Sequence, residues 1–440
     1  MASAASLPAY PPIGAPEKFG WKLVQLGRGA RQMVRTALAG SLAKRPAHVP
    51  PERVVDFDFI RQPGMEHDTY AVWQGLRGGP AIFWTPRNGG NWVLTRAEDI
   101  DTVLRDHETY SSKSIGIPRG SSTFRLLPIE ADPPEHAIYR GLISPWLTPR
   151  AIGALEQDIR GLTIQLVEGL QERGHSDFVH DFAKRLPIDI FLKLVDLPLG
   201  DREKLLRWTE DAVRASSLQQ RLAAFWKMTS YLDHWITLRR RRPGTDLISQ
   251  IVTAEIAGRP ITYGEIQGLL IVFMLGGLDT VASMLGFVVR FLAEHPEHRR
   301  ALVEDPGRIP AAVEELLRRF GLVNNARVVT RDHRLGGVDL KAGDIVQVPT
   351  GMAGLDPVLV AEPMTVNFER PKIAHATFGI GPHYCPGAFL AKMELKIFLE
   401  EWLKRIPDFA IAPGDAVRCA PGMVNSFDKL EIVWEPEAAQ

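Results

Sequence analysis

Hydrophobic residues at helical spacing dominate the chain from about residue 96 to residue 320. Segments with an apolar face follow one another there, and polar breaks such as DPPEH (132–136) and RRRRPGTD (239–246) separate them. A further helix is predicted at 388–406, AFLAKMELKIFLEEWLKRI. Apolar residues that recur three or four positions apart indicate one buried helix face. We therefore expect the middle and the end of the chain to be mostly helical.

Shorter apolar runs predict a small amount of sheet. The segment AIFWTPRNGGNWVLT (81–95) has two apolar, aromatic-rich stretches around Asn-Gly-Gly, which is the pattern of a hairpin. Strands are also predicted at 326–330 (ARVVT), 344–349 (DIVQVP) and 430–434 (LEIVW). The expected fold class is mainly α with minor β.

The longest apolar run, LLIVFMLGGL, extends from Leu269 to Leu278 and ends at Asp279. It has half of the ~20 residues that cross a bilayer, so we expect no transmembrane segment. The simplest interpretation is a buried helix with a kink at Gly276 and Gly277. Because a glycine inside a helix costs about 1 kcal/mol relative to alanine, this pair also indicates that another group approaches the backbone.

The amino-terminal fifty residues differ in composition from the rest. Residues 1–16 are rich in Ala, Pro and Ser and are expected to be disordered, whereas 18–45 carry seven basic residues and no acid. This second stretch fits a membrane-surface or partner-docking helix, a transit peptide, or a solvated extension packed on the body, and we favour the last. The expected organisation is an extension at 1–50 and a single domain at 51–440.

Charge and cysteine content exclude several classes of protein. The 440 residues include 52 basic and 52 acidic side chains, and this balance argues against nucleic-acid binding. Two cysteines, Cys385 and Cys419, form neither a zinc pattern nor a disulfide framework. With no secretory signal, the expected location is the cytoplasm. The four arginines at 239–242 fit an anion-binding patch, or the basic last turn of a helix, which we favour.

The segment FGIGPHYCPG (378–387) surrounds one of these cysteines with glycine and proline. A cysteine can be a small buried hydrophobe, a nucleophile with His383 as its base, or a metal ligand. The glycines permit positive φ, and the following helix directs its amino end toward the sulfur, which favours a thiolate. His383 has no evident orienting partner, so a thiolate ligand to a haem iron fits this loop better than a nucleophile.

Three motifs together resemble the cytochrome P-450 monooxygenases. The loop matches F-x-x-G-x-x-x-C-x-G, EELLRRF contains E-x-x-R, and LGGLDTVAS matches the oxygen-binding helix of that family. The resemblance covers roughly residues 50–436 and is closest to the bacterial camphor-hydroxylase (camphor 5-monooxygenase) type. It implies the cytochrome P-450 fold, with haem b held between a distal oxygen-binding helix and a proximal cysteine loop.

The resemblance also implies roles for individual residues. Cys385 would be the axial ligand of the iron, Asp279 and Thr280 would deliver protons for oxygen activation, and Arg214 would pair with Asp279. Glu315 and Arg318 would brace the cysteine loop without a catalytic role. The expected haem contacts are Arg140, Arg327 and His383 at the propionates, together with Phe378, Gly379, Gly387, Gly276 and Gly277.

Departures from the camphor-hydroxylase pattern bear on the substrate. Phe124 stands where that type has a tyrosine that bonds the substrate ketone, and Asn325 replaces an acid near the propionates. Pro386 follows the ligand in place of leucine and removes one N–H donor. The implied substrate is small and hydrophobic, without a carbonyl anchor: a terpenoid, cyclic ether, norisoprenoid or alkyl-aromatic. Candidate pocket walls are Phe124, Val272, Leu275 and Val323.

The family also implies partners. Electrons would come from NADH through a flavin reductase and an iron–sulfur ferredoxin, which would dock near the cysteine loop beside Arg140 and Lys372, and the protein would be a monomer. A peroxide-driven peroxygenase and a non-catalytic haem sensor or carrier are the alternatives. The Asp279–Thr280 pair favours oxygen activation over both.

Overall fold

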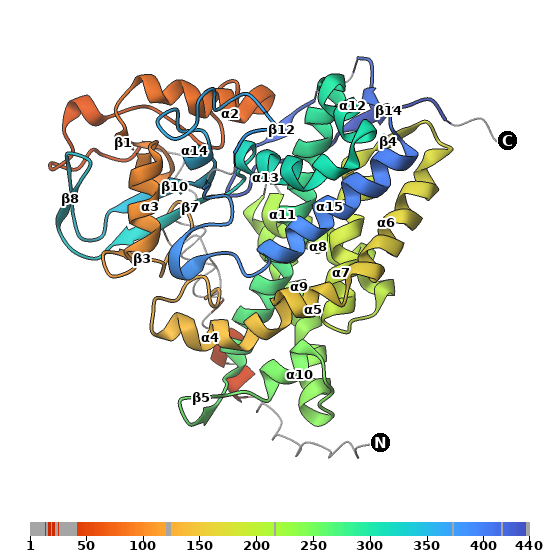
Figure 1. The fold of residues 1–440 in the computed structure, drawn as a ribbon. Coiled ribbons are helices and arrows are strands. Elements are labelled where there is room, and N and C mark those ends of the chain that lie inside the picture. The colour runs from red at the N-terminus through yellow and green to blue at the C-terminus, as the bar shows by residue number, and fades with distance from the viewer. Residues whose placement is uncertain are drawn as a thin grey trace.

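The computed structural model describes residues 14, 16–18, 20–22, 25, 42–119, 125–214, 217–371, 374–414 and 417–436. Helices form most of this part of the chain, and a sheet region lies to one side of them (Figure 1). The fold is therefore mainly α with minor β, as the sequence predicts.

The helices follow the predicted apolar periodicity. They are α2 (Met65–Gly75), α3 (Ala97–Arg105), α4 (Glu135–Ile143), α5 (Pro149–Gly153), α6 (Glu156–Gln171), α7 (Arg185–Leu194), α8 (Arg202–Arg214), α9 (Leu218–Arg241), α10 (Leu247–Val252), α11 (Tyr263–Glu294), α12 (Pro296–Glu304), α13 (Ile309–Arg319), α14 (Thr350–Gly354) and α15 (Ala388–Arg405).

The main sheet has five strands in the order β1-β2-β10-β7-β3. These are β1 (Ile82–Thr85), β2 (Asn91–Leu94), β3 (Tyr110–Ser111), β7 (Asn324–Val329) and β10 (Ile345–Pro349). β10 runs parallel to β2, and the other pairs are antiparallel. The predicted hairpin is confirmed, because β1 pairs with β2 and its turn holds Asn88, Gly89 and Gly90 at positive φ.

The remaining strands are short. β4 (His175–Asp177), β11 (Ala410–Ile411) and β14 (Glu431–Val433) form one sheet, in which β14 confirms the strand predicted at 430–434. Three two-stranded ladders complete the set: β5 (Glu255–Ile256) with β6 (Arg259–Pro260), β8 (His333–Leu335) with β9 (Val338–Leu340), and β12 (Cys419–Ala420) with β13 (Ser426–Phe427).

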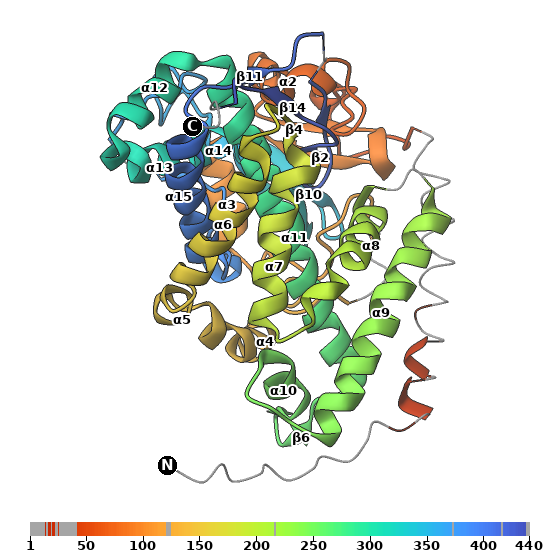
Figure 2. The same ribbon diagram turned by 90° about the vertical axis from the view of Figure 1, so that its right-hand side faces the viewer.

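The long helix α11 runs through the middle of the molecule, with α7, α9 and α15 around it (Figures 1 and 2). It begins at a capping box in which Thr262 and Glu265 each bond the backbone of the other. By length and hydropathy α11 could cross a bilayer, but 67% of its apolar window is buried inside the protein. It is a core helix, which agrees with the sequence interpretation.

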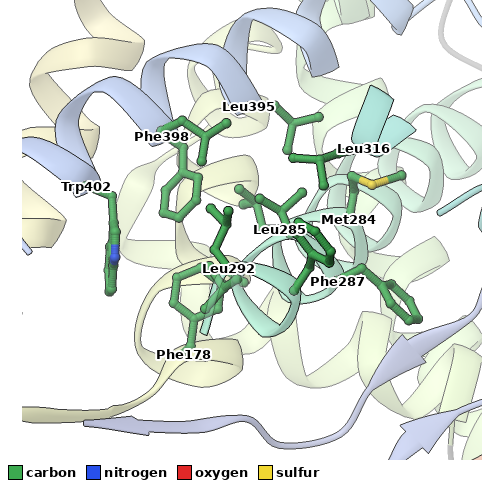
Figure 3. Packing of buried hydrophobic residues seen from close by; sticks show 14 of the residues in the cluster. Phe178, Met284, Leu285, Phe287, Leu292, Leu316, Leu395, Phe398 and Trp402 are labelled. Atoms are coloured by element: carbon green, nitrogen blue, oxygen red, sulfur yellow. The ribbon is translucent and has the colours of Figure 1, made fainter. Parts of the chain in front are cut away.

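Aromatic and aliphatic side chains join α11 to its neighbours. Leu285 and Leu292 of α11 pack in one cluster with Phe398 and Trp402 of α15 and with Phe178 (Figure 3). Burial of such side chains contributes about 1.5–3 kcal/mol each. This cluster fixes α15, and therefore the loop that precedes it, against the central helix.

The arginine run ends a helix, as we favoured. Arg239, Arg240 and Arg241 form the last turn of α9. Arg239 pairs with Asp196 and Asp246, and Arg240 donates to the carbonyls of Val252 and Ile261. The run therefore tethers the end of α9, and its second arginine is buried.

Part of the amino-terminal extension packs on the body. Glu17 Oε1 accepts the Tyr263 N–H at 2.7 Å, and Lys18 Nζ lies 2.7 Å from Asp233 Oδ1. The Trp21 ring meets the edge of Tyr263 at 5.3 Å between centroids. These contacts agree with an extension packed on the domain, at the start of α11. Most of the other residues in 1–41 lie outside the described part of the chain.

Candidate functional site

The cysteine loop turns tightly against α3. The Cys385 N–H donates to Phe378 O at 2.7 Å, which closes the loop on itself. Gly379 and Gly381 have φ of +74° and +72°, which side chains other than glycine rarely adopt. A Cβ on Gly381 would lie 2.8 Å from the Leu104 carbonyl oxygen at the end of α3. The two glycines are therefore needed for the loop geometry.

The Cys385 thiol sits in a pocket that can stabilise its anion. Burial raises its pKa, while the backbone N–H groups of Gly387 and Ala388 and the guanidinium of Arg140 oppose that rise. Pro386, between the ligand and these donors, has no N–H to offer. The sulfur therefore has donors from the start of α15 and one cation, but no adjacent base that would make it a nucleophile.

Helix α4 supplies one wall beside the loop. Arg140 Nη2 donates to Tyr384 O at 2.7 Å, which joins α4 to the residue before the cysteine. One turn earlier on α4, the ring of His136 lies 4.2 Å from that of His383. His136 is 4% exposed, and the Nε2 atoms of both histidines are buried without a hydrogen-bond partner. Two orphaned ring nitrogens therefore lie together.

Arg327 of β7 is a buried cation close to these histidines. It is 3% exposed, and its Nη1 donates to the neighbouring Ala326 carbonyl. Among the described residues it forms no ion pair, because the nearest acid, Asp132, is bound by Ser111 and Ser112. Burial lowers the pKa of Arg327 to about 10. An isolated buried charge is costly, so this site fits a ligand that brings carboxylates.

The electrostatics of His383 also indicate a site for an anionic ligand. Burial, together with the positive charges of Arg327 and Arg140, lowers its pKa to about 3. The Oδ1 atom of Asn325, which replaces an acid on β7, is also buried without a partner. The cluster of Arg140, Arg327, His136 and His383, here called the cradle, is therefore suited to an anionic group.

The middle of α11 has an accessible side, although the helix lies in the core. Val272, Gly276 and Thr280 follow one another at four-residue spacing and are partly or fully exposed, whereas Leu278 and Asp279 are buried. A Cβ on Gly276 would meet no atom within 4 Å. Residues four apart share one helix face, so this strip borders open space, as a bound planar group would require.

The two glycines of α11 differ. A Cβ on Gly277 would lie 3.6 Å from the Phe191 ring of α7, which is an ordinary packing distance. Gly277 therefore has a neighbour on α7, whereas Gly276 borders the open space. The expected contact of both glycines with the cofactor stays a prediction.

The acid–hydroxyl pair of α11 is in place. Thr280 Oγ1 donates to Gly276 O at 2.8 Å, within its own helix. Asp279 is 8% exposed, and its carbonyl accepts from Ser283 Oγ at 2.7 Å. Because the threonine proton is engaged by the backbone, its oxygen presents lone pairs to the open side.

The predicted pocket walls are only partly described. Val272 and Leu275 are partly buried residues of α11, and Val323 lies just before β7, at the edge of the core. Phe124 and Lys372 lie outside the described residues, and so does the side chain of Arg214. The geometry is consistent with an apolar wall at Val272 and Leu275.

Glu315 and Arg318 form a buried clamp. Arg318 is 2% exposed and donates Nε and Nη2 to the two carboxylate oxygens of Glu315, at 2.7 and 2.8 Å. Its other donors reach the carbonyls of Gly354, Pro363 and Thr365. Burial raises the pKa of Glu315, but bonds from Arg318 and the Asn367 N–H lower it overall. The clamp holds residues 354–370, which lead into the cysteine loop.

Phe378 and Gly387 stand beside the thiol. Lys392 Nζ lies 5.6 Å from the centroid of the Phe378 ring, and a Cβ on Gly387 would be 3.8 Å from Cys385 Sγ.

His136 is a site residue that the sequence did not predict. Its position four residues before Arg140, in DPPEHAIYR, was an available signal, because i and i+4 side chains share a helix face.

Comparisons with known proteins agree with this geometry. The model of the Cytochrome P450 family matches residues 215–412. Probable cytochrome P450 127A1 of Sinorhizobium fredii is 36% identical over 400 residues, covering 88% of this chain and 96% of that protein. The chain belongs to the cytochrome P450 family.

A second relative and a solved structure show which members of the family this chain resembles. Erythromycin C-12 hydroxylase of Saccharopolyspora erythraea is 36% identical to this chain. The alignment covers 78% of this chain and 89% of that protein. The crystal structure of CYP101C1 has a TM-score of 0.82 and 39% identity, covering 89% of this chain and all of that one. The likeness to CYP101 structures confirms the resemblance to the camphor-hydroxylase type. The protein is a cytochrome P450 monooxygenase, and its family implies a haem iron.

Proposed function

We propose that this protein is a ferredoxin-dependent haem-thiolate monooxygenase that hydroxylates a small hydrophobic substrate. Cys385 would be the axial ligand, and the cradle would hold the haem propionates, with Phe378, Gly379 and Gly387 shaping the proximal side. The observation that carries this proposal is the buried guanidinium of Arg327, which lies beside the thiol loop and has no carboxylate partner in the part of the chain that the structure describes. Two propionates would supply the missing negative charge.

When bound, haem iron supplies the redox chemistry that places one atom of dioxygen in a C–H bond and reduces the other to water. The chain's residues hold charge and protons around it. The N–H groups of Gly387 and Ala388, with Arg140, favour the Cys385 thiolate.

On the distal side, Thr280 would act first as an acceptor. Its proton is donated to Gly276 O, so its oxygen can hold a water or another donor at the open strip. Asp279, buried on the next position of the helix, would relay protons toward that oxygen. The pair would admit protons to a space that otherwise excludes water.

The substrate would be apolar. Val272 and Leu275 line the strip beside Gly276, and Val323 lies at the core edge. An apolar pocket discriminates by size and shape more than by functional group. We therefore propose a terpenoid, norisoprenoid or alkyl-aromatic substrate, without hydrogen bonding to a carbonyl, and Phe124 would complete the wall.

The electron donor would dock on the proximal face. Tyr384 and Phe389, 46% and 40% exposed, flank the cysteine loop, and Ile138 of α4 is 43% exposed. Arg140 is half-buried and engaged with Tyr384, so positive charge for docking would come chiefly from other residues, including Lys372. We propose an iron–sulfur ferredoxin here, reduced from NADH by a flavin reductase, and a monomeric enzyme in the cytoplasm.

The test uses the purified holoprotein and Cys385→Ala. The native protein is expected to show the shifted carbon-monoxide absorption band of a thiolate-ligated haem after reduction, and the variant is expected to lose it. An unchanged band in the variant would refute the ligand assignment. Turnover with NADH, reductase and ferredoxin, compared with hydrogen peroxide alone, separates the monooxygenase from a peroxygenase, and the absence of product in both indicates a sensor or carrier.

A further inference from the structure

A second cavity lies near the far end of α11. It has a volume of about 250 Å³ and is bounded by α2, the last turns of α11 and the end of α13. Phe287, the wall residue of α11 nearest to Thr280, is seven residues beyond it, which is about 10 Å along the helix axis. No residue of the strip at Gly276 or of the cradle lines the cavity, so the cavity is separate from both among the described residues.

Arg319 provides the polar end of this cavity. It is 8% exposed, its Nε donates to Met364 O at 2.8 Å, and its guanidinium lies over the rings of Tyr70 and Phe320 at 5.2 and 4.8 Å. Its Nη1 is buried without a hydrogen-bond partner. Among the described residues Arg319 forms no ion pair, unlike the neighbouring Arg318. The Arg319 charge is therefore buried without an ion-pair partner in the described part of the chain.

The other charged groups at the cavity are already engaged. Arg290 pairs with Glu294 at 3.0 Å and donates to His67 O. Asp68 Oδ1 accepts the N–H groups of Tyr70 and Ala71. Asp68 contributes negative charge near Arg319, but among the described residues no carboxylate forms an ion pair with Arg319.

Aromatic rings line the cavity, and two of them lie directly beside Arg319. Tyr70, Phe287, Phe291 and Phe320 contact one another with ring centroids 5.4 to 6.0 Å apart. In another protein an apolar cavity of about 150 Å³ binds benzene. A volume of 250 Å³ therefore accommodates one ring together with a carboxylate.

We propose that this cavity binds a small aromatic carboxylate. The carboxylate would accept from the Arg319 guanidinium, and the ring would pack on Phe287, Phe291 and Phe320. Such a ligand would contact α2, α11 and α13 at once and stabilise the folded protein in proportion to its concentration.

A cysteine on the cavity wall allows access to the cavity to be measured. Cys419 lies on its wall, and the chain has only one other cysteine, Cys385. Alkylation of Cys419 in the holoprotein, followed by peptide mass, therefore measures access to the cavity. Benzoate is the probe, and benzamide is its neutral counterpart of the same shape. Saturating imidazole, an iron ligand, blocks the haem site during calorimetric titration.

The expected result is one equivalent of benzoate bound in the presence of imidazole, with slower alkylation of Cys419. Benzamide and the variant Arg319→Gln should each weaken binding at least tenfold, because a charge-assisted bond is lost. Met364→Trp, which fills the cavity and leaves the carbonyl that Arg319 uses, should abolish binding. Arg308→Gln, at a more exposed arginine, should leave it unchanged.

Three outcomes would overturn the proposal. They are equal affinity for benzamide, binding that survives Met364→Trp, and benzoate binding that disappears with imidazole. If Arg319→Gln fails to fold, the benzamide comparison and Met364→Trp still decide the question. All of these readouts are independent of turnover, so the result does not depend on the proposed function.

Discussion

Two buried arginines lie in neighbouring elements and have opposite surroundings. Arg318 of α13 bonds both oxygens of Glu315 and three backbone carbonyls. Arg327 of β7 is equally buried, yet its one bond within the described residues is to Ala326 O. A charge that the chain satisfies by itself stabilises the fold, whereas a charge that it leaves unsatisfied marks the place of a ligand.

Loss of the ion pair between Glu315 and Arg318 should have the largest effect on the stability of the fold. Glu315→Gln leaves the Arg318 charge buried with a neutral partner, and loss of one member of a buried ion pair costs about 3–5 kcal/mol. We expect the free energy of unfolding to fall by that amount, measured by urea denaturation followed by circular dichroism.

A matched control lies next to it on the same helix. Glu314 pairs with Lys392 at the surface, where both side chains are 29% exposed. Glu314→Gln should cost at most about 1 kcal/mol. Equal losses in the two variants would show that the clamp contributes no more than a surface pair.

Glu394 of α15 is a buried acid that protonation keeps neutral, which differs from both arginines. It is 1% exposed, its Oε2 has no partner, and burial raises its pKa to about 8. The folded state therefore keeps a proton that the unfolded state releases above its pKa near 4.5. Stability should fall as the pH rises between these values, by about 2.7 kcal/mol from pH 5 to pH 7.

Glu394→Gln tests this because it keeps the neutral shape without the titration. Urea midpoints measured from pH 5 to pH 8 should decline less steeply in the variant than in the native protein. Parallel pH profiles would show that Glu394 is ionised in the folded state and has a partner.

Loss of an arginine should have opposite effects on the stability of the haem-free protein in the cradle and in the clamp. Arg327→Met removes an unsatisfied cation, so the haem-free protein should keep or gain stability, while Arg318→Met should destabilise it. In the holoprotein the same Arg327 variant should lose haem roughly 10- to 100-fold faster, because a charge-assisted bond is worth about 1.5–3 kcal/mol. Transfer of haem to an apo-globin, followed by absorbance, measures this rate. A slower or unchanged rate would contradict the propionate assignment.

The sequence predicted the clamp and the cradle to different degrees. Glu315 and Arg318 are three residues apart on one helix, so their pairing follows from the helix repeat. Arg140, Arg327 and His383 come from α4, β7 and the cysteine loop, and periodicity alone could not bring them together. They were predicted only through the resemblance to the cytochrome P450 family.

What the sequence could not predict depends on three-dimensional packing. His136 was missed because its importance comes from contact with His383, 247 positions away. The contact of Gly277 with the Phe191 ring of α7 likewise depends on how the two helices pack, and the glycine pair in the sequence does not predict it. The cavity at Arg319 was not expected either, since its aromatic walls read as ordinary core in the sequence.

The thiol loop completes the comparison, because Cys385 as a haem ligand would carry negative charge there, whereas the cradle carries positive charge. The donors near Cys385 Sγ are the N–H groups of Gly387 and Ala388, and Pro386 contributes none. Pro386→Leu adds one N–H beside the sulfur. We expect the reduction potential of the holoprotein to rise by roughly 20–60 mV, the equivalent of about 0.5–1.5 kcal/mol for one hydrogen bond.

Pro386→Ala separates the donor from the side chain, because alanine restores the N–H without leucine's bulk. Potentiometric titration of both variants should give similar rises. A rise in the leucine variant alone would assign the effect to exclusion of water by the larger side chain. Unchanged potentials in both variants would mean that the N–H at position 386 does not reach the sulfur, and that Gly387, Ala388 and Arg140 balance its charge without further help.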